Sequence, residues 1–341
     1  MANKTYDIII IGYGTPNSFE SKMQKEWVRM GHSAELFTTN DLYNMLPGYT
    51  RKDFMNLRRK ASLDSFFRKY YEYGLDFIMV CQTWLRYKND IHVPVFYYHR
   101  ELDMFPQVDR PTYIIMNVPE AQSYLREHHP DFYYQAMQRK LCYIAVDPEE
   151  FNPNREKDLK GLQFVGNWEI ANTWAEQETS NYMWKEVMGN IMEIPEYVSK
   201  HGLATIHVDG NILTCPSFEI YKDVLERSEA FLITTAKFVY ITRRQMEAAA
   251  CKTLNVIWVQ NDRAEKVQNE LGFYDRENCI MFRDKKELKN GAVTWTEDER
   301  LEMVEKAYNL ILERHTYKHR AQLIIDIFER KKGFINPLSH L

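Results

Sequence analysis

The chain has 341 residues, 45% of them hydrophobic and 14% aromatic, and a formal net charge of −4. This length favours two domains over a single core, and the slightly acidic balance excludes a global field that would recruit nucleic acid or an anionic membrane. Five singly scattered cysteines argue against a disulfide framework or a zinc site, and no apolar run follows a basic leader or reaches the length of a membrane span.

The first predicted elements are an apolar strand over residues 7–11, a helix over residues 17–30 and a second strand over residues 34–38. This order is typical of a β-α-β unit in a parallel sheet. Between the first strand and the helix, two glycines leave room for a ligand close to the backbone. Asn17 stands where the dinucleotide-binding fingerprint has its third glycine, so we interpret the turn as the rim of a cleft. The residues of this turn are Gly12, Tyr13, Gly14 and Thr15.

A long helix of strongly basic character is predicted over residues 51–73. Its cations are Arg51, Lys52, Arg58, Arg59, Lys60, Arg68 and Lys69. A solvated outer face is the usual explanation of such a run. The alternative is contact with a polyanion such as DNA, in which each lysine or arginine follows a phosphate.

Further apolar segments predict the other strands of an N-terminal sheet, over residues 76–81, 93–99, 112–117 and 142–146. Strands that are apolar throughout and separated by helical segments indicate a parallel sheet. Ligands of such sheets bind at the carboxyl ends of the strands. One of these ends carries His99, Glu101 and Asp103, which are of the right types to act as a general base. The structural alternative is a loop held together by ion pairs with Arg100.

An interdomain linker is predicted over residues 147–154, where two prolines occur among polar residues without periodicity. The C-terminal half then repeats the α/β pattern, with strands over residues 162–167, 204–208, 230–235, 254–259 and 279–282. We predict an N-terminal domain over residues 1–150, completed by a helix over residues 315–332. The C-terminal domain is predicted over residues 151–314.

One segment of the C-terminal half predicts a capped helix that leads directly into a buried strand. Thr242 is the expected N-cap, and Gln245 is its expected partner in a capping box. The N–H groups and the dipole of such a helix start favour an anion, and Arg243 and Arg244 add two cations there. Glu247, one turn further, can accept hydrogen bonds from the vicinal hydroxyls of a sugar. The pattern fits a nucleoside diphosphate, and the alternative is a solvated helix start with surface arginines.

The same segment resembles a family of enzymes. The phrase R-x-x-E-A-x-A-C over residues 244–251 is similar to the donor-site helix of GT-B glycosyltransferases, especially those related to the spore-maturation CgeB proteins. The phrases V-D-P-x-x-F-x-P over residues 146–153 and H-T-Y-x-x-R over residues 315–320 also resemble this group. The sequence departs from the group at Lys252, where glycine is usual, and at Val239, where many retaining members carry an acidic residue.

The resemblance implies an α/β fold of two Rossmann-like parallel-sheet domains facing across a cleft, with the C-terminal helix crossing back to the N-terminal domain. It implies that Glu247 holds ribose, that Arg243 or Arg244 holds phosphate, and that the turn over residues 12–15 faces acceptor and sugar. The expected donor-binding residues are Gly166, Asn167, Lys237, Thr242, Arg243, Arg244 and Glu247. The spacing Glu101-x-Asp103 is also similar to the metal-chelating pair of GT-A enzymes. Because that fold has a single nucleotide-binding domain, we expect neither a metal nor another cofactor.

We therefore expect a cytoplasmic enzyme that transfers a hexose from a nucleotide diphosphate, with a UDP-sugar as donor, to an acceptor hydroxyl. One candidate acceptor is a 5-hydroxymethylpyrimidine in double-stranded phage DNA, bound through the Arg51–Lys69 helix, and the compartment is then the host cytoplasm. The other candidate acceptors are a polysaccharide, a protein and a small metabolite. Two alternatives outside transfer chemistry are a GT-B sugar-nucleotide epimerase and a non-catalytic nucleotide-sugar binder.

Overall fold

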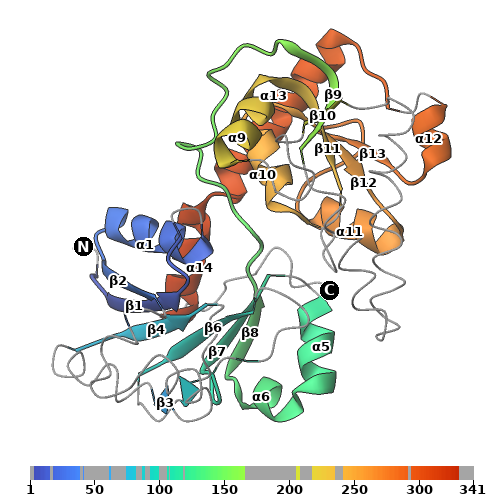
Figure 1. The fold of residues 1–341 in the computed structure, drawn as a ribbon. Coiled ribbons are helices and arrows are strands. Elements are labelled where there is room, and N and C mark those ends of the chain that lie inside the picture. The colour runs from blue at the N-terminus through green and yellow to red at the C-terminus, as the bar shows by residue number, and fades with distance from the viewer. Residues whose placement is uncertain are drawn as a thin grey trace. The chain divides into compact units, whose positions relative to one another are not determined.

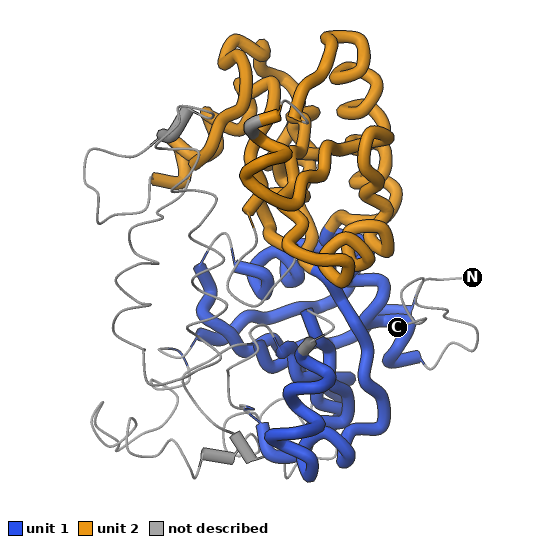
Figure 2. Tube along the Cα trace, turned by 90° about the vertical axis from the view of Figure 1, so that its right-hand side faces the viewer, with its two compact units in different colours: residues 1–143, 317–341 blue, residues 144–316 orange. Residues whose placement is uncertain are grey.

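The computed structural model describes residues 4–15, 18–38, 41, 61–62, 74–81, 87–88, 93–99, 106, 108–117, 120–165, 205–207, 217–234, 241–290 and 293–329. The chain divides into two compact units (Figure 2). The first unit comprises residues 1–143 and 317–341, and the second comprises residues 144–316. The last helix of the chain therefore belongs to the unit that contains the N-terminus.

The first unit contains a parallel sheet with the strand order β2-β1-β4-β6-β7-β8 (Figure 1). Its strands are β1 (Asp7–Gly12), β2 (Ser33–Thr38), β4 (Phe77–Val80), β6 (Val95–His99), β7 (Tyr113–Met116) and β8 (Gln138–Leu141). Its helices are α1 (Phe19–Arg29), α5 (Glu120–His128), α6 (Pro130–Gln135) and α14 (Tyr317–Phe328). Strands β4, β6 and β7 are buried along their whole length, which explains why they form continuous apolar runs in the sequence.

Helix α14 packs against α1, although the two helices come from opposite ends of the chain. The fully buried Trp27 on α1 donates its indole N–H to the carbonyl oxygen of Ala321 at 3.2 Å. The hydroxyl of Tyr6 donates to the carboxylate of Glu329 just beyond α14. These contacts, together with the apolar face of α14, make the C-terminal helix part of the core of the first unit.

Two expected elements of the first unit are wrong. Strand β8 lies at residues 138–141, whereas a strand was expected at the more apolar residues 142–146. The earlier segment pairs with β7 at the edge of the sheet, and Val146 instead bridges to Thr316. The continuous helix expected over residues 51–73 is interrupted by β3 (Ala61–Ser62), which pairs with β5 (Tyr87–Lys88). In both cases pairing with a distant segment overrides the local pattern. The rest of the Arg51–Lys69 range lies outside the described residues.

The second unit contains a parallel sheet with the strand order β10-β9-β11-β12-β13. Its strands are β9 (Leu159–Val165), β10 (Thr205–His207), β11 (Ser228–Ile233), β12 (Leu254–Trp258) and β13 (Ile280–Phe282). Its helices are α9 (Phe218–Arg227), α10 (Arg243–Ala250), α11 (Asp262–Glu270), α12 (Lys285–Lys289) and α13 (Glu297–Arg314). One face of this sheet forms a hydrophobic cluster with Leu288, Met303 and Val304 from α12 and α13. Phe231 and Asn255 lie on the opposite face of the sheet, because successive side chains of a strand point to opposite faces. There Phe231 contacts Tyr221 of α9, and Asn255 contacts Gln245 of α10.

Two buried polar side chains, one after α13 and one in α14, donate to backbone carbonyl oxygens. His315 is 4% exposed, and its Nε2 lies 2.8 Å from the carbonyl oxygen of Leu271, to which it donates. Arg320 is 8% exposed and donates from Nε to the carbonyl oxygen of Tyr143 at 2.7 Å. Each side chain therefore forms its hydrogen bond within its own unit. No helix in the described part of the chain has both the length and the apolar character needed to cross a bilayer.

Candidate functional site

The topology of the second unit identifies one edge of its sheet as the place for a ligand. From β9 the chain runs to β10 on one side and then returns to β11 on the other side of β9. In open parallel sheets, ligands bind outside the carboxyl ends of strands at such a reversal. Helix α10 starts at this edge because it connects the end of β11 to the beginning of the parallel strand β12. The N-terminus of α10 therefore lies where a ligand is expected.

Helix α10 begins without the expected capping box. Thr242 has the extended backbone of an N-cap residue, but its side chain makes no capping hydrogen bond. Gln245 is fully buried and donates its amide to Gln268 on α11 at 2.5 Å, so it does not reach back to Thr242. The Thr242 hydroxyl is buried and has no hydrogen-bond partner among the described residues. Because the Thr242 side chain makes no capping hydrogen bond, the first N–H groups of α10 keep their capacity to bind an anion.

Glu247 is the most buried charged group of this helix, with 2% of its surface exposed. Its Oε1 lies 2.6 Å from Nε of Arg243, which is 34% exposed and belongs to the preceding turn. Its Oε2 accepts a short hydrogen bond from the hydroxyl of Tyr221 on α9. Burial raises the pKa of Glu247 above its ordinary value, while Arg243 and the Tyr221 hydrogen bond act in the opposite direction. The site thus holds a buried carboxylate whose ionised form depends on these two neighbours.

Arg244 supplies the second cation at the start of α10. The centre of its guanidinium lies 5.9 Å from the ring centroid of Phe164, near the carboxyl end of β9. This distance is at the outer limit of a cation–π contact, so Phe164 restrains Arg244 only weakly. The structure therefore brings Thr242, Arg243, Arg244 and Glu247 together at one sheet edge. The other predicted donor-binding residues, Gly166, Asn167 and Lys237, lie outside the described residues.

In the first unit, the predicted turn also follows a strand at a chain reversal, since β2 and β4 lie on opposite sides of β1. The backbone N–H of Tyr13 donates to Oε1 of Glu20 at 2.7 Å. A Cβ at Gly12 would lie 2.5 Å from Cγ of Glu20, and one at Gly14 would lie 2.4 Å from Cγ2 of Thr38. Side chains of the protein itself therefore lie in the space that a Cβ would occupy at these two glycines.

Of the three residues expected to act as a general base, the structure describes His99. His99, at the end of β6, is fully buried, and its Nδ1 lies 3.3 Å from the hydroxyl of Tyr97. This side chain therefore has no exposed surface in the structure. Glu101 and Asp103 lie outside the described residues.

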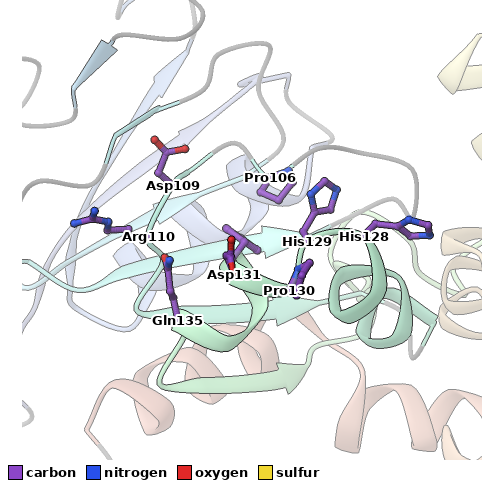
Figure 3. A pocket seen from close by; sticks show the side chains of 9 residues that line it. Pro106, Asp109, Arg110, His128, His129, Pro130, Asp131 and Gln135 are labelled. Carbon is purple, nitrogen blue, oxygen red and sulfur yellow. The ribbon is translucent and has the colours of Figure 1, made fainter.

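A separate hollow of about 450 Å³ lies in the first unit (Figure 3). Asp109 and Arg110 line it just before β7, and His128, His129 and Asp131 line it at the junction of α5 and α6, which precedes β8. It therefore lies toward the amino ends of these parallel strands, away from the edge formed by the turn at residues 12–15. Among the described residues, no group of three or more His, Cys, Asp or Glu side chains is arranged to hold a metal ion.

Sequence reasoning missed two residues that shape these sites. From the sequence alone, no role is assigned to Tyr221 or to Glu20. Their contacts span 26 residues for Tyr221 with Glu247 and 7 residues for Glu20 with Tyr13. The second of these was within reach of local analysis, because a buried Glu in the first turn after a glycine-rich loop can accept from the loop backbone.

Comparisons with known proteins find one matching family model and several similar solved structures. Residues 215–326, which include α9, α10 and most of α14, match a family model described as glycosyl transferase-like. Comparison with curated proteins finds no match. A solved glycosyltransferase from Rickettsia africae ESF-5 is similar with a TM-score of 0.57 and 8% identity, over 96% of this chain and 98% of that chain. Anabaena Alr3699/HepE in complex with UDP gives a TM-score of 0.55 and 11% identity, over 96% and 100%. Its complex with UDP-glucose gives 0.53 and 12%, over 95% and 100%.

These similarities extend over both units and agree with the two parallel sheets described above. The chain has the two-domain, Rossmann-like GT-B fold, so the fold class predicted from the sequence is confirmed. The family match covers the part of the chain that carries the start of α10 and Glu247.

Proposed function

We propose that this chain is a glycosyltransferase that moves a hexose from a UDP-sugar to an acceptor hydroxyl. The observation that carries the proposal is the start of α10 at the chain reversal of the second sheet. Arg243, Arg244 and Glu247 meet there, within a segment that matches a glycosyl transferase-like family model. The donor class is supported by the fold neighbours that were solved with UDP and UDP-glucose.

In the proposed complex, the diphosphate lies against the first N–H groups of α10, and Arg243 and Arg244 neutralise its charge. Glu247 accepts hydrogen bonds from the two ribose hydroxyls. During transfer, the bond from the anomeric carbon to the phosphate oxygen breaks and its electron pair stays on the diphosphate. The cations and N–H groups stabilise this growing charge, which is the main catalytic contribution of the second unit. Gly166, Asn167, Lys237 and Thr242 complete the proposed donor site.

The acceptor is proposed to bind at the first unit, beside Gly12, Tyr13, Gly14 and Thr15. The acceptor oxygen forms the new bond to the anomeric carbon and loses its proton. If configuration is inverted, Glu101 or Asp103 takes that proton, and the burial of His99 makes it the weakest of the three candidates. Glu101→Ala and Asp103→Ala should leave UDP affinity intact and lower transfer. Full activity in both variants would remove this segment from the reaction.

A donor-by-acceptor screen tests the proposal directly. The acceptors are double-stranded DNA with 5-hydroxymethylpyrimidine, oligosaccharides, proteins and small metabolites, each incubated with UDP-sugars. The sequence supports the DNA arm through the cations between Arg51 and Lys69, and reversing Arg58, Arg59 and Lys60 to Glu should abolish activity on DNA alone. Incubation with UDP-glucose without acceptor is the control, since only an epimerase would convert the sugar. UDP binding without turnover on any acceptor would reduce the protein to a nucleotide-sugar binder.

A further inference from the structure

The buried carboxylate of Glu247 has two protein partners that differ in how firmly they are held. Arg243 is 34% exposed and reaches Oε1 from the solvent side of α10 on a long, flexible stem. The aromatic ring of Tyr221 lies among three phenylalanine rings. The ring centroids of Phe151, Phe218 and Phe231 lie 6.3, 6.5 and 6.4 Å from that of Tyr221. Phe151 and Phe231 are buried, so the position of the Tyr221 hydroxyl is set by packing.

The hydrogen-bonding capacity of Glu247 leaves room for a ligand. A carboxylate offers about four lone-pair sites. In the structure, one site of Oε1 is used by Arg243 and one site of Oε2 by Tyr221. Two ribose hydroxyls can therefore donate to Glu247 while the Tyr221 hydrogen bond persists. Arg243 is the partner that can leave, because an incoming diphosphate offers it a stronger, doubly charged acceptor.

We propose that Tyr221 is a positioning residue that holds the carboxylate of Glu247 in its ribose-binding orientation while Arg243 moves to the diphosphate. This inference rests on the proposed function, because it assigns Tyr221 a part in nucleotide recognition. It also gives a role to the linker phrase of the sequence, since Phe151 of that phrase helps to fix the Tyr221 ring.

The arrangement predicts a particular pH dependence. The charged and titratable groups that interact with Glu247 are Arg243 and Arg244 of α10, Cys251 at its end, Tyr221 of α9 and Glu150 before β9. Burial and the charge of Glu247 raise the pKa of Tyr221 well above its ordinary value, so its hydroxyl stays protonated and donates. Glu247 must be ionised to accept two ribose hydroxyls, so nucleotide affinity is lost as the pH falls through the pKa of Glu247. Removing the Tyr221 hydroxyl removes a stabiliser of the ionised form and moves this loss to higher pH.

The test is calorimetric titration of the full chain with UDP between about pH 5 and about pH 8. The variants are Tyr221→Phe, Glu247→Gln, the double variant, and Tyr274→Phe as a matched control from an exposed tyrosine of the same unit. Tyr221→Phe should lower UDP affinity about tenfold at neutral pH and move the acidic loss upward by about one pH unit. It should have little further effect in the Glu247→Gln background, and Tyr274→Phe should behave as the wild type.

The outcomes separate the inference from the proposed function. Failure of the wild type to bind UDP overturns the proposed function. Binding that depends on Glu247 but is unchanged in Tyr221→Phe overturns only the positioning role. A loss of affinity in Tyr221→Phe with an unmoved pH profile also overturns it, because that result describes a merely structural side chain. The Phe variant keeps the aromatic packing, so we expect it to fold, and its thermal midpoint is measured in parallel.

Discussion

Replacement of Glu247 by Gln separates donor binding from stability at this site. In the free protein the amide oxygen can accept from Nε of Arg243, and the amide N–H₂ can donate to the Tyr221 hydroxyl, which accepts as well as donates. Both partners that Glu247 has in the structure are therefore retained. We expect the free energy of unfolding to change by no more than about 1 kcal/mol.

The effect of Glu247→Gln on nucleotide affinity should be larger. Hydrogen bonds to a charged group contribute about 1.5–3 kcal/mol and those between neutral groups about 0.5–1.5 kcal/mol. Two ribose hydroxyls that lose a charged acceptor therefore lose about 2 kcal/mol together, which corresponds to a roughly thirtyfold rise in Kd. Glu247→Ala should instead destabilise the fold by about 2 kcal/mol or more, because it leaves Arg243 and the Tyr221 hydroxyl without their partner.

The assay is calorimetry with UDP beside thermal unfolding of the same samples. The matched ligand is 2′-deoxyuridine 5′-diphosphate, which lacks one of the two ribose hydroxyls. Its Kd should rise less than that of UDP when Glu247 is replaced by Gln. If Glu247→Gln melts like the wild type and binds UDP equally well, Glu247 does not hold the ribose and the donor-site assignment fails.

Three further predictions concern Arg244, Gly14 and Trp27. Arg244→Gln should raise the Kd for UDP about tenfold and leave that for uridine unchanged, as titration with both ligands would show; equal losses would refute a phosphate role. Gly14→Ala should destabilise the protein by about 1 kcal/mol or more in urea unfolding, because φ is +70° there and the new Cβ meets Thr38; unaltered stability would contradict the described turn. Trp27→Phe removes the hydrogen bond to Ala321 and should cost about 1–2 kcal/mol in urea unfolding; unchanged stability would contradict the described packing of α14 on α1.

The strands of both sheets could be predicted because their burial is visible locally. A parallel strand covered on both faces, such as β4, β6 or β12, forms an uninterrupted apolar run in the sequence. The edge strand β8 escaped this reasoning, because only one of its residues is buried and the adjacent residues 142–146 are more apolar. Residues 138–141 form a strand because they pair with β7, and a linear pattern does not contain that information.

The start of α10 shows the same division at the level of the site. The sequence by itself determined that a helix begins after Thr242, that two arginines stand at its start and that Glu247 follows one turn later, because these features depend on helical spacing alone. Only the tertiary structure decided that Gln245 turns to Gln268 and that Glu247 is held by Tyr221, 26 residues earlier in the chain. The reason is physical: buried polar groups must find hydrogen-bond partners, and which partners they meet depends on how neighbouring helices pack on the sheet.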